Sequence, residues 1–283
     1  MKMNKAAIAL FVFLSPALLL SGPKIKNACA ENGPVMKNRP VMKNRLEANF
    51  SYEYLAPNGP YGSWKTFNLA WYRRPSRDLT YFLRVGAFSR KDGQGGLGTA
   101  GAYKDWATWM YTYTDLSLGT NSDYLPQARA DNDFNFKLGE KKNIVWTAGL
   151  SYIKYSGVHK DFILSTGLTL YLGRWIGTYR LFRNTSAPGS VISWSHLFAA
   201  GYGREGWQWT WLNISFGKQA CLSPYLAAPS PSLISRQDSV LIDISHRRWL
   251  GGTWGVYVDA SYFKLYDGGY EKYGIAPGVF KEF

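Results

Sequence analysis

The sequence predicts an all-β protein, a transmembrane antiparallel up-and-down β-barrel of about 14 strands with no soluble helical domain. Three observations indicate this fold class. Segments of roughly 10 to 13 residues alternate between apolar and polar side chains, as strands with two different faces do. The connections between these segments are long and short in turn. The chain also carries 12 Trp and 20 Tyr, a heavy load for a soluble protein.

The first 30 residues are typical of a secretory signal peptide. The basic start MKMNK precedes the apolar run AAIALFVFLSPALLL, which is short for a membrane span and contains Pro16. Ala28-Cys29-Ala30 then supplies an A-x-A cleavage site just before Glu31. We predict an exported protein that is cleaved here, with an uncleaved anchor as the alternative.

Cleavage changes the charge and the cysteine content of the mature chain. The formal charge falls from +14 to +10, because four lysines leave with residues 1–30. Cys221 then stands alone, which excludes an intramolecular disulfide. The remaining basic charge is dispersed and the protein leaves the cytoplasm. An acidic polymer or an anionic lipid surface is therefore favoured as a partner over nucleic acid.

Residues 31–45 are predicted to form a short basic linker. The hexapeptide PVMKNR occurs twice in it, at 34–39 and 40–45, without any aromatic residue. We expect this segment to be disordered or to lie at a membrane surface, with docking to a periplasmic partner as the functional alternative.

Residues 46–283 are predicted to form the barrel, with no domain boundary. In the first strand, LEANFSYEYL (46–55), Phe50 and Tyr52 fall on one face, and Glu47 and Glu53 fall on the other. A soluble sandwich would bury the apolar face, whereas a membrane barrel presents it to lipid. Because backbone groups in a bilayer must all be paired, only a closed barrel fits strands of this length. The other clear strands are 64–74, 79–89, 127–138, 144–155, 238–248 and 253–263.

The connections separate the two ends of the predicted barrel. The short turns are 74–78, 104–107, 139–143, 173–175, 203–206 and 250–252, and the long loops are 56–63, 89–98, 120–126, 184–189 and 218–232. Long loops at one end and tight turns at the other are typical of outer-membrane barrels. The Pro-rich loop 218–232 is a candidate for a plug that folds into the lumen.

The face opposite the lipid face supplies the candidate lumen-lining residues. The polar candidates are Glu47, Glu53, Arg84, Arg129, Asp131, Asp133, Lys137, Arg180, Asp243 and Asp259, and the aromatic candidates are Tyr72, Phe82 and Tyr257. The charges either wet an open lumen or pair across the barrel and stabilise a plugged interior. The aromatic rings either stack on sugar rings or fill space. Strands ~4.8 Å apart and tilted ~40° give a backbone diameter of roughly 28 Å and leave room for a pore on the order of 10 Å.

Aromatic pairs near the strand ends predict interfacial girdles. These pairs are Trp106 with Trp109, Trp207 with Trp209, and Tyr266 with Tyr270. The C-terminus carries a barrel-assembly signal of the kind that the barrel-insertion machinery reads, with Gly278 and the terminal Phe283 matching it and Lys281 departing from it.

Several of these segments carry a family resemblance. They are SYEYL followed by a G-x-W segment, the strand ending WYRR, Tyr-Leu-Pro at 124–126, GLSYIKYS, and LTLYLGRW at 168–175. Together they resemble the YaiO family of outer-membrane β-barrels over most of residues 46–283. The resemblance implies an integral protein of the outer membrane of a Gram-negative bacterium. Some relatives resemble polysaccharide-secretion components, which implies an exopolysaccharide and a periplasmic export protein as partners. Longer members carry helical repeats before the barrel, whereas we expect only the basic linker in this chain.

The histidines give little support for catalysis. His196 and His246 each follow a serine directly, and neighbours in a strand point to opposite faces, so neither pair forms a Ser–His dyad. A cross-strand dyad of His246 with Ser261 stays open, although His246 fits better as an interfacial residue near the periplasmic rim. We expect no enzyme and leave an outer-membrane hydrolase or acyltransferase as the minor alternative.

Other motifs for cofactors are equally weak. The chain has no His/Cys spacing for zinc and no G-x-S-x-G element, so we expect no metal and no cofactor. The stretch GQGGLG (93–98) looks like a phosphate-binding loop, but with no helix after it we expect a flexible external loop.

Two functional hypotheses follow. The first is a porin-like channel, or a component of one, that passes a polysaccharide or a polar solute across the outer membrane. The second is a structural or adhesion barrel that binds ligands through its external loops.

Overall fold

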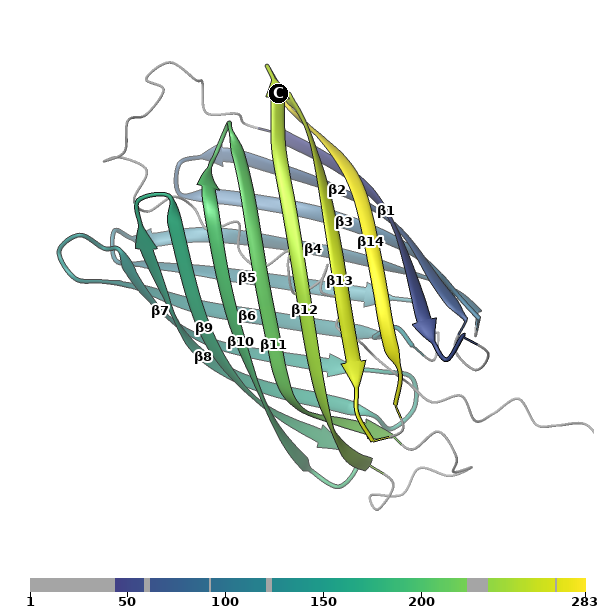
Figure 1. Cartoon of the computed structure of the whole chain (residues 1–283). Coiled ribbons are helices and arrows are strands. Elements are labelled where there is room, and N and C mark those ends of the chain that lie inside the picture. The colour runs from purple at the N-terminus through teal and green to yellow at the C-terminus, as the bar shows by residue number, and fades with distance from the viewer. Residues whose placement is uncertain (1–43, 59–61, 92, 121–123, 223–233, 268) are drawn as a thin grey trace, which may run out of the picture.

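The computed structural model describes residues 44–58, 62–91, 93–120, 124–222, 234–267 and 269–283, without the side chains of 219–222 and 234–236. Fourteen strands form one closed antiparallel barrel in which every strand pairs with its neighbours in sequence, and β1 pairs with β14 to complete the ring (Figure 1). The predicted fold class is therefore confirmed. No helix among the described residues is long and apolar enough to cross a membrane.

The strands are β1 (Asn44–Ala56), β2 (Ser63–Ser76), β3 (Leu79–Arg90), β4 (Gly93–Ala107), β5 (Met110–Gly119), β6 (Ala128–Leu138), β7 (Ile144–Lys154), β8 (Lys160–Leu172), β9 (Trp175–Ala187), β10 (Val191–Arg204), β11 (Gln208–Leu222), β12 (Ile234–Gly251), β13 (Trp254–Leu265) and β14 (Glu271–Glu282). The predicted linker and signal peptide lie outside the described residues, except that Asn44 and Arg45 belong to β1 rather than to the linker.

Alternation along each strand decides which side chains meet lipid. In β1, Phe50 and Tyr52 lie on the outer surface with 48% and 39% of their area exposed, whereas Glu47 and Glu53 are buried on the inner side. This matches the prediction for both faces. A closed ring leaves no strand edge, so the ladders supply partners for backbone groups that lipid could not hydrate.

The two ends of the barrel differ as predicted in most connections, but β3 ends at Arg90 and β4 begins at Gly93, so this predicted long loop is as short as the turns at the other end. The chain termini meet at one end, where the amide of Asn44 donates to Phe283 O at 2.9 Å and the amide of Phe283 donates to Asn44 O at 3.0 Å. The tight connections after β2, β4, β6, β8, β10 and β12 lie at this same end, which we name the turn end. Outer-membrane barrels place their short turns in the periplasm. The opposite end is named the loop end.

Parts of three predicted loops are strands instead. GQGGLG (93–98) is not a flexible loop but the start of β4, whose residues pair with β3 from Arg90↔Gly93 to Val85↔Gly98. Glycine lacks the side chain that would reveal alternation, yet its backbone still pairs in a ladder. Residues 184–187 likewise extend β9, because they pair with β8 from Ile163↔Asn184 to Lys160↔Ala187. Asn184 and Ser186 point inward and donate hydrogen bonds to Asp161. In the predicted plug segment, residues 218–222 extend β11 and residues 223–232 lie outside the described residues.

The predicted aromatic girdles are only partly correct. Trp106 and Trp109 are exposed on the outer surface, with 66% and 53% of their area accessible. Trp209, however, packs against an inner cluster of buried side chains, and Tyr270 is almost fully buried inside the loop end. Trp209 shares the inward parity of Asn213, and this parity is a stronger guide to its position than its closeness to a strand end.

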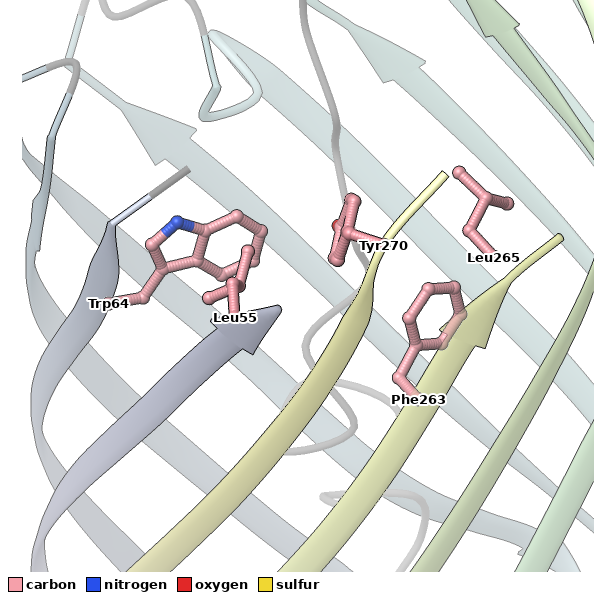
Figure 2. Close-up of a cluster of buried hydrophobic side chains, with 5 residues drawn as sticks. All are labelled: Leu55, Trp64, Phe263, Leu265 and Tyr270. Carbon is pink, nitrogen blue, oxygen red and sulfur yellow. The ribbon is translucent and has the colours of Figure 1, made fainter. Parts of the chain in front are cut away.

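Apolar side chains narrow the interior near both ends. Figure 2 shows the cluster at the loop end, where Leu55 and Trp64 lie over the ends of β1 and β2, and Tyr270, Phe263 and Leu265 come from the opposite side of the seam between β1 and β14. Burying each of these side chains stabilises the fold by about 1.5–3 kcal/mol. Toward the turn end, the inward side chains of Tyr111, Val145, Tyr171 and Ile176 form a second cluster.

Candidate functional site in the barrel lumen

Between these clusters lies a cavity of about 420 Å³ to which each of the fourteen strands contributes lining residues. Of the predicted lumen candidates, Glu47, Glu53, Arg84, Asp133, Arg180, Asp243 and Asp259 line it, together with Tyr72 and Tyr257. Arg129, Asp131, Lys137 and Phe82 also point inward, but they lie outside this cavity in contacts with neighbouring side chains. The predicted inner face is therefore brought together around one space.

Most inward charges form ion pairs that cross several strands. At the turn end, Arg247 of β12 reaches over β13 and β14 to Glu47 of β1, with Nη1–Oε1 at 2.7 Å and Nη2–Oε2 at 3.2 Å. Arg45 contacts Glu47 as well, and also binds Glu282 and Glu205. Such paired, bidentate contacts hold charges at low hydration and fix the positions of the side chains.

A second cross-strand bridge joins β9 to β6. Arg180 Nη1 donates to Asp133 Oδ2 at 3.0 Å, and Nη2 donates to the other carboxylate oxygen and to Ser165 Oγ at 2.7 Å. Gly149 of β7 lies directly beneath this bridge. A Cβ there would overlap Asp133, Arg180 and Ser165, so glycine lets the guanidinium lie flat against the wall.

Two further arginines hold a pair of aspartates on adjacent strands. Asp115 and Asp131 are direct partners in the β5–β6 ladder. Arg84 donates to Asp115 Oδ2 at 3.2 Å, and Arg129 donates to Asp131 through Nη2 at 2.7 Å. Sequence reasoning identified three of these residues and missed Asp115, which shares the inward parity of Tyr111 and Tyr113.

Asp243 and Asp259 differ from the other inward carboxylates. Among the described residues neither has a lysine or arginine at ion-pair distance, and Asp243 accepts only one hydrogen bond, from Asn213 Nδ2 at 3.3 Å. Both residues line the cavity. Asp259 is partly exposed to the cavity, whereas the side chain of Asp243 is buried with 1% of its area accessible.

An aromatic platform lies beside these carboxylates. Trp209 and Trp211 stack with ring centroids 5.7 Å apart and an interplanar angle of 26°, and both line the cavity. Gly201 pairs with Trp211 in the β10–β11 ladder, and a Cβ at Gly201 would come within 2.6 Å of the indole ring. The ring of Trp211 therefore lies against the backbone of β10 at Gly201, where no side chain stands in its way. Sequence reasoning missed these two tryptophans, although they alternate with their neighbours in the same way as Asn213 and so point to the same face of β11.

Inward aromatics elsewhere fill space. Phe82 packs with Tyr103 and Tyr113 in a buried cluster, with Tyr72 against it. The rings of Phe82 and Tyr113 are stacked with centroids 5.9 Å apart. Phe82 thus takes the space-filling role, whereas Tyr72 and Tyr257 remain on the cavity wall.

No serine–histidine dyad forms in the described part of the barrel. Ser261 faces the cavity, whereas His246 lies on the outer face and its Nδ1 is 2.9 Å from Thr210 Oγ1, so the open His246–Ser261 dyad is excluded. His196 faces outward too, 3.0 Å from Tyr179 Oη. His159 lies inside, with Nε2 3.4 Å from Asp161 Oδ2. The described residues contain no group of three or more metal-ligating side chains.

The two residues of the predicted assembly signal lie at the closing strand. Gly278 of β14 faces inward beneath the ring of Tyr257, which a Cβ at this position would overlap. Phe283 is 54% exposed at the turn end. The close approach of Tyr257 requires glycine here for packing, and recognition by the insertion machinery stays a prediction.

Comparison with known proteins adds a family and a set of similar folds. The YaiO membrane beta barrel domain matches residues 43–222. No curated protein sequence matches the chain.

Solved structures with little sequence identity share the fold. A bacterial polysaccharide outer-membrane secretin is 9% identical with a TM-score of 0.52, covering 86% of this chain and 100% of its own. The CymD monoaromatic hydrocarbon channel is 10% identical with a TM-score of 0.54, covering 86% and 89%. An outer-membrane channel from Pseudomonas putida F1 is 8% identical with a TM-score of 0.51, covering 87% and 97%.

Proposed function

Because the chain belongs to the YaiO membrane β-barrel family, we propose that it is an outer-membrane channel, or the outer-membrane component of an export route, that passes a polysaccharide or another polar solute. The observation that carries the proposal is the cavity at the centre of the barrel, with an aromatic platform and the partly exposed carboxylate of Asp259 on one wall. An exopolysaccharide and a periplasmic export protein are the partners that we propose with it.

The chemistry of this wall suits a sugar. A pyranose ring offers an apolar face that can lie on an indole and a rim of hydroxyl groups that donate to carboxylates. Trp209 and Trp211 supply the first kind of contact, and the carboxylate of Asp259 supplies the second. We therefore propose that sugars stack mainly on these two tryptophans and not on the aromatic residues predicted from the sequence.

The size of the cavity limits what can pass. At about 420 Å³ it falls within the range of small-ligand sites, roughly 300–1,000 Å³. It holds a short stretch of one glycan strand and is far too small for a folded protein. The inward charges form ion pairs around the cavity and also keep its wall polar. Both interpretations of these charges, as ion pairs across the barrel and as a wetted lumen, therefore contribute to the proposal.

Equilibrium binding tests the proposal. Calorimetric titration of the refolded protein with neutral and anionic oligosaccharides should give saturable binding. Replacing both platform residues (W209L/W211L) keeps apolar bulk in the lumen and should weaken binding at least tenfold. The control is W254L, because Trp254 lies on the outer surface. Unchanged affinity in the double variant, or no binding by the wild type, would contradict a sugar site on this platform.

A further inference from the structure

The seam that closes the barrel contains an interruption in its pairing. β1 and β14 keep one register on both sides of it, with Asn49↔Gly278 before and Tyr52↔Ile275 after, but the two pairs between them are absent. One of the missing pairs would join Phe50 to Pro277. Pro277 has no N–H to donate to β1, while its pairing with β13 continues through Val258.

A proline at this place is unusual. Proline inside sheets is found at edges and bulges, and a closed barrel has no edge. Phe50 and Pro277 lie near the middle of their strands, where the surroundings are hydrocarbon and no water replaces a lost ladder bond. The junction between the first and the last strand therefore lacks ladder pairing in the middle of the wall.

The outer surface is hollowed at the same place. A shallow groove of about 430 Å³ lies over the interruption, and the outward residues along it are Ala48, Phe50, Phe67, Val256, Pro277 and Val279. All of them are apolar. The shape and chemistry of this groove fit an extended acyl chain.

The inner cavity reaches the same part of the wall. Ser51, Gly274 and Ala276 line the cavity at the seam, and their side chains are small or absent. Asn49 and Tyr257 line both the cavity and the outer groove. The polar lumen and the lipid-facing groove therefore border the same short stretch of the wall from its two sides.

We propose that the β1–β14 seam is a lateral opening between the lumen and the bilayer, and that the acyl chain of an outer-membrane lipid occupies the groove and passes into the seam. Such an opening admits an amphiphile whose polar head enters the lumen while its chain stays in the membrane. It is independent of whether a sugar binds to the tryptophan platform.

Photocrosslinking tests this placement. The protein is reconstituted in vesicles of a phosphatidylethanolamine that carries a diazirine midway along one acyl chain, and the adducts are located by mass spectrometry. We expect adducts on the inward seam residues Ser51 and Ala276. Asn135 and Thr147 face inward as a direct pair on β6 and β7, where pairing is continuous, and should carry none.

Restoring the missing donor provides the matched perturbation. P277V and P277A both return an N–H to β14, and either should lower labelling of Ser51 and Ala276 at least fivefold while Phe50 on the outer surface stays labelled. I275V, which changes an outward residue of β14 that already has its N–H, should label as the wild type does. Wild-type adducts confined to outward residues, or equal inward labelling after the donor is restored, would overturn the proposal.

Discussion

Breaking the Arg180–Asp133 bridge should destabilise the barrel strongly. The two side chains are 18% and 11% exposed, and the guanidinium makes two contacts to the carboxylate. In D133A the arginine keeps its charge in a poorly hydrated wall without its partner. Removing one partner of a buried pair costs about 3–5 kcal/mol. Because this pair borders the cavity and water can enter, we expect a loss near 3 kcal/mol.

The double variant D133A/R180M distinguishes the cost of leaving Arg180 charged without its partner from the cost of removing side-chain volume. A well-packed apolar replacement of both partners is often neutral. We therefore expect the double variant to recover most of the stability that D133A loses, with a coupling energy of about 1–3 kcal/mol. The measurement is equilibrium urea unfolding in lipid vesicles, followed by tryptophan fluorescence.

An exposed pair provides the control for this experiment. Lys218 and Asp238 form an ion pair with side chains 53% and 56% exposed. K218A should change the free energy of unfolding by no more than about 1 kcal/mol, as is usual for exposed pairs. If D133A behaves like K218A, or if the double variant is as unstable as D133A, the bridge does not hold the wall together and the reasoning is refuted.

Three further predictions follow from other contacts. G149V should destabilise the barrel as much as D133A does, because the added side chain displaces the same bridge, and a stable G149V in the same urea assay would contradict this. G278A should lower the unfolding midpoint by overlapping the ring of Tyr257, and Y257A should rescue it; failure of rescue would favour the assembly-signal interpretation. Asp78, in the turn after β2, forms an ion pair with Lys104. Hydrogen bonds from Lys104 and Ser76 lower the pKa of Asp78. Its carboxyl should therefore stay ionised as the pH falls through the usual pKa range of an aspartate, and the ion pair should be lost only below that range. A ¹³C NMR titration with an ordinary midpoint would refute that lowered pKa.

The sequence predicted the faces of the strands far better than the contacts on them. Alternation with period two placed Glu47 inward and Phe50 outward without knowledge of any neighbour. It could not pair Glu47 with Arg247, because that contact depends on the closure of the ring and on a side chain reaching over two strands. Long-range pairing of this kind becomes visible only once the register is known.

Local composition is a poor guide to structure at a few positions. Glycines at 93–98 suggested a loop, although a barrel accepts glycine wherever both neighbouring strands supply the ladder. The aromatic ring of Tyr270 and its place near a strand end predict a girdle position, yet the side chain packs in the buried cluster at the mouth of the barrel. Pro277 would usually argue against a strand, and at this position it marks the seam instead.

The central proposal is that the lumen conducts a polar solute, and single-channel recording tests it most directly. The mature protein, refolded and inserted in a planar bilayer, should give a steady conductance that a soluble anionic polysaccharide blocks from one side. W209L/W211L should conduct but resist the block. A correctly inserted barrel that stays silent, or a conductance that no polysaccharide changes, would contradict the proposed channel.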